Sequence, residues 1–320
     1  MRRTATVVAM ALPAALFLAA CGSDSQASDD SLTKVTVATA PIADYAPLYL
    51  GVEKGFFEKQ GLQVEFASGR VGTETVTGVL SGTNQFAGVA LLPLLVSDSQ
   101  GLDVAAITPS SVAPGAEDPS TVHMLTTADS QFTSLQELEG ATVAVNALQA
   151  QAELTARLAV EKAGGNPDEL QFVEVPFPEM PAALQRGDVD AIVAVEPFVS
   201  TALDGGAVSL GEIDRSLSEG APTTTFFTSA QYAQSDPEVV DKFTAAMTES
   251  VDYAAENPDE VRAIIPEYTQ VSEELAQEIA LPTFSSELNQ EGVTETAEAM
   301  HRFGWIESLP EVGSLFEVES

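Results

Sequence analysis

The sequence has little of the chemistry that metal sites and covalent catalysis use. Its 320 residues include one cysteine, Cys21, and two histidines, His123 and His301. The two histidines lie far apart, and neither has a second ligand at the spacing of a metal site. Nucleophile-elbow, zinc-protease and phosphate-loop motifs are absent. We therefore expect no metal, no cofactor and no enzymatic activity; a hydrolase with paired carboxylates remains the alternative, although no acidic pair stands out.

Basic residues are also scarce. The chain has 13 Lys and Arg against 48 Asp and Glu, which gives a formal net charge of −35. Such a surface repels nucleic acid and anionic lipid headgroups, so we expect no nucleic-acid partner. The 45% content of hydrophobic residues nevertheless favours a folded core over disorder. We interpret the acidity as a solvated surface.

Long apolar runs are confined to the N-terminus. Arg2 and Arg3 precede an apolar stretch at 7–20, which Pro13 interrupts. A basic start, a short apolar middle and small residues at the end are typical of a secretory signal peptide. The stretch is too short to span a bilayer comfortably. We expect residues 1–20 to be a signal peptide that is removed on export.

The end of this stretch predicts a lipid anchor. Residues 18–22 read LAACG, which looks like a bacterial lipobox with Cys21 as the lipidated N-terminus. An ordinary secreted protein with a chance cysteine is the alternative. Residues 22–31, GSDSQASDDS, are small, polar and acidic. We expect residues 21–31 to be a flexible tether between the lipid and the folded part.

The remaining sequence alternates strand and helix patterns. Residues 35–66 predict a strand, a loop, a helix beginning near Pro47 and a second strand, with Gly55 at a left-handed helix cap. Further short apolar strands are expected at 86–90, 104–107, 121–126, 142–146, 170–175, 191–195 and 223–228. Helical patterns separate most of these strands, and the chain after 228 is mainly helical. This order predicts an α/β fold with parallel sheets.

Three stretches carry a family resemblance. They are APLYLGVEKGFFEKQGLQVEF at 46–66, residues 135–145, and MPAALQRGDVDAIVAVEPF at 180–198. Together they resemble type II periplasmic binding proteins of the sulfonate/nitrate/thiamine-precursor class, over roughly residues 32–307. Gln85 stands where an Asp is usual in that family, in a turn where the departure has little consequence.

The resemblance implies a two-lobed type II periplasmic-binding-protein fold. Each lobe would be a mostly parallel sheet flanked by helices. Lobe 1 would comprise 32–124 and 225–320, with a helical C-terminal segment, and lobe 2 would comprise 125–224. A ligand would be held between the lobes, which close on it by a hinge motion.

The resemblance also implies a function. It predicts a monomeric, extracytoplasmic solute-binding lipoprotein that is anchored to the cell membrane at Cys21. Its partners would be a small-molecule ligand and the permease subunit of an ABC importer. The alternatives are a secreted enzyme on the same fold and a sensory or adhesive surface protein.

Candidate binding residues follow the ends of the expected strands, where ligands bind in open α/β sheets. Tyr45 is expected to stack on a planar ligand, Arg70 to clamp an anion near a helix N-terminus, and Glu196 to accept hydrogen bonds from an amine or ring N–H. An exposed loop aromatic, a surface arginine and a helix-stabilising acid are the respective structural alternatives. The predicted ligand-binding residues are Asp44, Tyr45, Ser68, Gly69, Arg70, Thr73, Leu91, Asn146, Gln149, Glu196, Thr224 and Phe226.

These residues leave two ligand classes open. Arg70 with hydroxyl and backbone donors favours a small sulfonate-, taurine- or nitrate-like nutrient, which is the preferred prediction. Glu196 with Asp44 and Tyr45 favours a thiamine-precursor pyrimidine or another nitrogenous ring, which is the alternative.

Overall fold

The computed structural model describes residues 32–68, 73–310 and 312–316. The predicted signal peptide, the lipidation site Cys21 and the tether lie outside the described residues, as do Gly69 and Arg70. Within the described ranges, no helix combines the length and the apolar character needed to cross a membrane.

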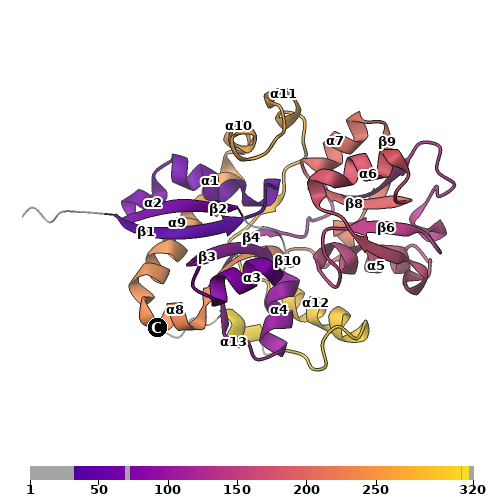
Figure 1. Cartoon of the computed structure of the whole chain (residues 1–320). Coiled ribbons are helices and arrows are strands. Elements are labelled where there is room, and N and C mark those ends of the chain that lie inside the picture. The colour runs from indigo at the N-terminus through magenta and orange to yellow at the C-terminus, as the bar shows by residue number, and fades with distance from the viewer. Residues whose placement is uncertain (1–31, 69–72, 311, 317–320) are drawn as a thin grey trace, which may run out of the picture. The chain divides into compact units, whose positions relative to one another are not determined.

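The first of two sheets has six strands in the order β11-β4-β10-β3-β1-β2. β1 pairs in parallel with β2 and β3, whereas β10 is antiparallel to β3 and β4, and β11 is antiparallel to β4. Figure 1 shows the early strands of this sheet in indigo and purple. The strands are β1 (Thr33–Thr39), β2 (Leu62–Ser68), β3 (Phe86–Ala90), β4 (Val104–Val112), β10 (Pro222–Ser229) and β11 (Thr283–Phe284).

The second sheet has five strands in the order β7-β6-β8-β5-β9. β6 is parallel to β7 and β8, and β5 is antiparallel to β8 and β9. The strands are β5 (Val122–Thr127), β6 (Thr142–Val145), β7 (Gln171–Glu174), β8 (Ala191–Val195) and β9 (Ala207–Glu212).

The two sheets share one plan. In each, a parallel trio at one edge, β3-β1-β2 or β7-β6-β8, is extended by a strand that enters after the chain has crossed from the other sheet: β10 after β9, and β5 after β4. These entering strands run antiparallel to their neighbours, so the sheets are mixed rather than mostly parallel. The predicted α/β fold with two sheets is otherwise confirmed. The predicted lobe boundaries, after 124 and before 225, fall inside β5 and β10.

Helices lie between most of the strands and make up most of the chain after β10 (Figure 1). Pro47 lies in the first turn of α1, and Gly55 has a φ of +75°, as predicted. The helices are α1 (Ala46–Glu53), α2 (Phe56–Lys59), α3 (Thr73–Leu80), α4 (Leu91–Ser99), α5 (Gln151–Lys162), α6 (Met180–Arg186), α7 (Phe198–Asp204), α8 (Ala230–Ser235), α9 (Pro237–Glu256), α10 (Pro258–Tyr268), α11 (Glu273–Ala276), α12 (Gln290–Arg302) and α13 (Val312–Phe316).

The core of the first sheet is built around α9. Its apolar face includes Phe243 and Met247, both fully buried. The ring of Phe243 stacks on Phe86 of β3 with centroids 3.8 Å apart. Burying such aromatic side chains contributes on the order of 2–3 kcal/mol each. The long helix therefore fixes the sheet whose strand ends carry part of the site described below.

Two parts of the strand pattern differ from prediction. The strand expected at 104–107 continues to Val112, because β10 and β11 supply partners along its second half, as in the pair Phe284 and Ser111. The edge strand β9 was not predicted, since its sequence AVSLGE is half polar and is exposed at several positions.

Candidate functional site

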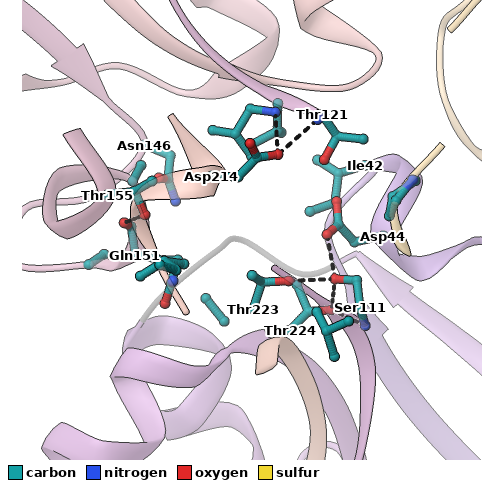
Figure 2. Close-up of a pocket in the computed structure, with 18 of the residues that line it drawn as sticks. Ile42, Asp44, Ser111, Thr121, Asn146, Gln151, Thr155, Asp214, Thr223 and Thr224 are labelled. Carbon is teal, nitrogen blue, oxygen red and sulfur yellow. Dashed lines mark hydrogen bonds between the residues drawn. The ribbon is translucent and has the colours of Figure 1, made fainter. Parts of the chain in front are cut away.

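A pocket is lined by residues from both sheets and from the segments that cross between them. It encloses about 830 Å³ of empty space, part of which is open to solvent. Figure 2 shows its polar side chains arranged around this space. They are Asp44, Tyr45, Ser111, Thr121, Asn146, Gln151, Thr155, Asp214, Thr223 and Thr224.

Asp44 is held at the pocket by a tight turn. The 3-10 helix η1 (Ala43–Tyr45) follows β1, and Ala43 and Tyr45 are buried on either side of Asp44. The Tyr45 ring lies edge-on to Phe226, with centroids 5.8 Å apart. Gly88 makes room for it, since a Cβ there would lie 2.4 Å from the Tyr45 ring. Anchored on both sides, the turn has little freedom to move Asp44.

A chain of hydroxyl groups supports the Asp44 carboxylate. The Ser111 hydroxyl donates to Oδ1 of Asp44 at 2.6 Å. Thr223 and Thr224 lie 2.8 and 2.7 Å from the same Ser111 oxygen. Because Ser111 has one proton and an ionised carboxylate can only accept, both threonines donate to Ser111. Burial raises the pKa of Asp44, while the hydrogen bond from Ser111 acts in the opposite direction.

The second carboxylate of the pocket belongs to Asp214, in the 3-10 helix η5 (Asp214–Ser216). It is 2% exposed and accepts from the Ser120 hydroxyl at 2.6 Å and from the N–H groups of Thr121 and Val122 at 2.9 and 3.3 Å. These donors lie just before and at the start of β5. Asp214 therefore ties together the two segments through which the chain passes between the sheets.

Amides and a hydroxyl form the wall from the second sheet. Asn146 follows β6, Gln151 begins α5, and Thr155 lies one turn later. The Thr155 hydroxyl donates to the backbone carbonyl of Gln151 at 2.7 Å. In Figure 2 these three residues face Asp44 and Ser111 across the open space. The pocket therefore has a carboxylate wall and an amide wall.

The charge of this pocket is one-sided. It has two carboxylates, and no Lys, Arg or His is among the described residues that line it. Desolvated carboxylates favour a ligand that donates hydrogen bonds or carries positive charge. An anionic group in the same space would be repelled by both Asp44 and Asp214. The described part of the site thus suits a neutral or cationic ligand with N–H groups.

A second pocket has a different character. It is lined by Tyr49, Phe66 and Tyr268, whose rings form a continuous stack, with Phe198 also in the lining. None of the described residues that line this second pocket is charged. Because both carboxylates and the facing amides of Asn146 and Gln151 lie in the first pocket, the first is the candidate ligand site.

The structure brings together four of the predicted binding residues. Asp44, Tyr45, Asn146 and Thr224 all line the pocket. Ser68 ends β2 and Thr73 begins α3, while Gly69 and Arg70, between them, lie outside the described residues. Their binding roles stay predictions.

Four other predicted residues are placed away from this pocket. Leu91 and Phe226 are fully buried in the core. Gln149 is exposed, with a positive φ of 51°. Glu196 is 3% exposed, and its carboxylate accepts from the hydroxyl and the N–H of Ser200, which fixes the start of α7. This is the structural alternative considered for Glu196.

Sequence reasoning missed much of the polar lining. Ser111 lies beyond the strand predicted at 104–107, near the end of the extended β4. Asp214 follows the unpredicted strand β9, so no predicted strand end pointed to it. Thr223 is adjacent to the predicted Thr224, and this adjacency was the available signal. Gln151 begins α5 and lies two residues after the predicted Gln149.

Comparisons with known proteins agree with this fold. The model of the NMT1/THI5-like family matches residues 42–261. A formylaminopyrimidine-binding protein from Halalkalibacterium halodurans is 26% identical over 260 residues, which cover 79% of this chain and 76% of that protein.

Solved structures are similar at the level of fold. The alkanesulfonate-binding protein SsuA from Xanthomonas axonopodis pv. citri, bound to MOPS, has a TM-score of 0.73 at 15% identity and covers 89% of this chain and 98% of its own. The nitrate-binding protein NrtA from Synechocystis PCC 6803 has a TM-score of 0.75 at 15% identity, with coverages of 90% and 87%. The desulfurization enzyme DszB is also similar, with a TM-score of 0.66 at 14% identity and coverages of 90% and 97%. The fold is therefore shared by binding proteins and an enzyme.

Proposed function

This chain belongs to the NMT1/THI5-like family, and on that premise we propose that it is the solute-binding protein of an ABC importer for a nitrogen-bearing ring. The ring occupies the pocket between the carboxylate wall and the amide wall. The family assignment supports the binding role, and the 26% identical formylaminopyrimidine-binding protein supports the ligand class.

The observation that carries this choice of ligand is the Asp44 carboxylate. It is half-buried at the pocket, its side-chain donor is Ser111, and no cation lies among the described lining residues. A partly desolvated carboxylate is stabilised when a ligand supplies a charge-assisted hydrogen bond. An amino group or a protonated ring nitrogen supplies one, whereas a sulfonate or nitrate offers only acceptors.

The ligand class preferred from sequence, a sulfonate or nitrate, remains the second candidate. Its support is the similarity of the fold to sulfonate- and nitrate-binding proteins. It requires Arg70 to supply the positive charge that the described lining lacks. The two candidates differ in the sign of charge that the pocket must accept, so binding experiments can separate them.

The proposed mechanism is closure of the two sheets around the ligand. Both sheets contribute polar groups to one pocket, so a ligand that contacts both walls stabilises the closed arrangement. The crossing segments form a compact hinge, since Ala113 and Ala221 share an N–H···O bond of 2.8 Å, and Gly220 donates to Ala113 at 2.9 Å. The closed form then docks on the permease, and the ligand leaves unchanged.

A lipid anchor at Cys21 remains part of the proposal. It would hold the protein at the extracytoplasmic face of the membrane, close to the permease. The test is fractionation of cells that express the Cys21→Ala variant. The variant should leave the membrane fraction, and its retention there would contradict the anchor.

The ligand is tested by thermal shift with purified protein. The panel comprises aminopyrimidines, ethanesulfonate, taurine, nitrate and amino acids. A ligand present at 100 times its Kd stabilises the folded state by about 2.7 kcal/mol, which raises the melting temperature measurably. We expect aminopyrimidines to raise it and the donor-free anions ethanesulfonate and nitrate to leave it unchanged.

The other outcomes are equally informative. A shift with ethanesulfonate, taurine or nitrate alone would support the second candidate, and no shift with any compound would contradict both. Recovery of the bound ligand in chemically altered form would contradict a binding protein and support an enzyme.

A further inference from the structure

Gln151 has an unusual environment for an amide. Its Nε2 and Oε1 atoms are both buried, and neither has a hydrogen-bond partner in the described part of the chain. Buried polar groups in folded proteins are nearly always paired, because an unpaired one loses its bonds to water without replacement. This amide is therefore a group whose partner is missing from the protein itself.

The location of Gln151 indicates where the partner comes from. Within the described ranges, the other buried unpaired side-chain atoms are the hydroxyl oxygens of Thr225 and Thr283, and neither residue lines the pocket. Gln151 does line it, on the wall that faces Asp44 (Figure 2). Of these three residues, it alone has two unpaired polar atoms, a donor nitrogen and an acceptor oxygen held side by side.

We propose that Gln151 determines specificity by pairing with a ligand edge that carries an N–H donor and a ring-nitrogen or carbonyl acceptor side by side. This inference rests on the proposed function and narrows its ligand class. A primary amide presents its donor and its acceptor in one plane, which is the geometry with which Gln and Asn pair with adenine. The amide group can flip, which exchanges the positions of its donor nitrogen and its acceptor oxygen. An aminopyrimidine edge and a lactam edge therefore both fit.

The two walls then divide the recognition of the ligand. Asp44 accepts from a donor on one side of the ring, and Gln151 pairs with the donor–acceptor edge on the other. A sulfonate or nitrate would satisfy only Nε2 of Gln151 and would leave Oε1 unpaired. The amide wall therefore selects against anions that lack a donor, independently of the charge of Asp44.

The test is a cycle of one protein change and one ligand change, measured by isothermal titration calorimetry. The variant is Gln151→Met, which keeps the size of the side chain and removes the amide. The probes are 4-amino-2-methylpyrimidine and 2,4-dimethylpyrimidine, which differ by an amino group in place of a methyl group. The amino group contacts Asp44 equally in the wild type and in the variant, so this contribution to the affinity cancels in the cycle. The coupling free energy between the amino group and residue 151 then reports on Gln151 alone.

We expect Gln151→Met to weaken binding of the amino probe by about 5- to 150-fold, the range of one bidentate pair. Binding of the dimethyl probe, which keeps the ring-nitrogen acceptor but has no N–H for Oε1, should weaken by clearly less than binding of the amino probe. The melting temperature of the ligand-free variant should not fall, because no protein hydrogen bond is lost. Gln277→Met, at the exposed end of α11, is the matched control and should change neither affinity.

Equal weakening of both probes, or no weakening of the amino probe, would overturn the inference. If Gln151→Met folds poorly, Gln151→Ala serves as a second variant, because the smaller alanine side chain cannot overfill the site. If the wild-type protein binds neither probe, the proposed ligand class fails first. If the wild type binds the amino probe and the variant binds it equally well, only the role of Gln151 fails.

Discussion

Two carboxylates line the same pocket, yet their surroundings differ. Asp214 accepts three hydrogen bonds, two of them from backbone N–H groups, within the segments that connect the sheets. The Asp44 carboxylate, in the turn that follows β1, accepts one hydrogen bond from a side chain of another element, the Ser111 hydroxyl. Asp214 has its hydrogen-bond partners within the protein, whereas Asp44 can still accept hydrogen bonds from a ligand.

This difference separates structure from recognition. A carboxylate saturated by protein donors holds the chain in place, and its removal leaves those donors unpaired. A partly desolvated carboxylate with spare acceptor capacity costs stability until a ligand supplies a donor. We therefore assign Asp214 to the hinge and Asp44 to the ligand, although both lie in one pocket.

The largest expected effect comes from removing the saturated carboxylate. Asp214→Ala leaves the N–H groups of Thr121 and Val122 without this acceptor, and the Ser120 hydroxyl keeps its long 3.4 Å contact with the Val122 carbonyl. At about 1–3 kcal/mol for each buried unpaired group, we expect a loss of about 2 kcal/mol or more in the free energy of unfolding. Urea denaturation measures this loss.

Asp214→Asn is the matched control for this variant. It keeps the shape of the side chain and one acceptor oxygen, so it should lose less stability than Asp214→Ala. If Asp214→Ala were as stable as the wild type, the assignment of this carboxylate to the hinge would fail.

The smallest expected effect is a pH dependence that arises from Asp44. Burial raises the pKa of Asp44 above its usual value of 3.8. The usual pKa of 3.8 applies to Asp44 in the unfolded state, and the raised pKa applies to it in the folded state. Between these two values the folded state binds more protons than the unfolded state. Asp44 therefore lowers the free energy of unfolding as the pH rises through this window. Asp44→Asn lacks this contribution.

The stability of Asp44→Asn relative to the wild type should therefore increase from pH 3.8 upward. It should become constant once Asp44 is fully ionised in the folded wild type. Urea titrations of both proteins at matched pH values measure the difference. A difference that decreases with pH would show that the Asp44 carboxylate is stabilised within the protein and would contradict its assignment to the ligand.

The fold was largely predictable from local patterns. The strand–loop–helix–strand unit at 35–66 and the mainly helical chain after 228 depend on the period of neighbouring residues, and both formed as expected. The strand β9 was not predicted because an exposed edge strand needs no apolar pattern, and the sequence of β9 has little apolar pattern.

The site was only partly predictable, because its partners come from distant positions. Asp44 and Asn146 follow predicted strands, and the rule that ligands bind at strand ends placed them correctly in the pocket lining. Ser111 is 67 residues from Asp44, and only the tertiary structure brings them together. The choice of Gln149 over Gln151 reflects the start of one helix, which sequence patterns locate poorly.

The most direct test of the account is the effect of Asp44→Asn on affinity, measured by isothermal titration calorimetry with 4-amino-2-methylpyrimidine and with ethanesulfonate, a sulfonate that has no N–H donor. Loss of a charged acceptor should weaken aminopyrimidine binding by about tenfold or more. Ethanesulfonate should give no measurable binding to the wild type. Ethanesulfonate binding that becomes tighter in the variant, with aminopyrimidine binding unaffected, would contradict the account.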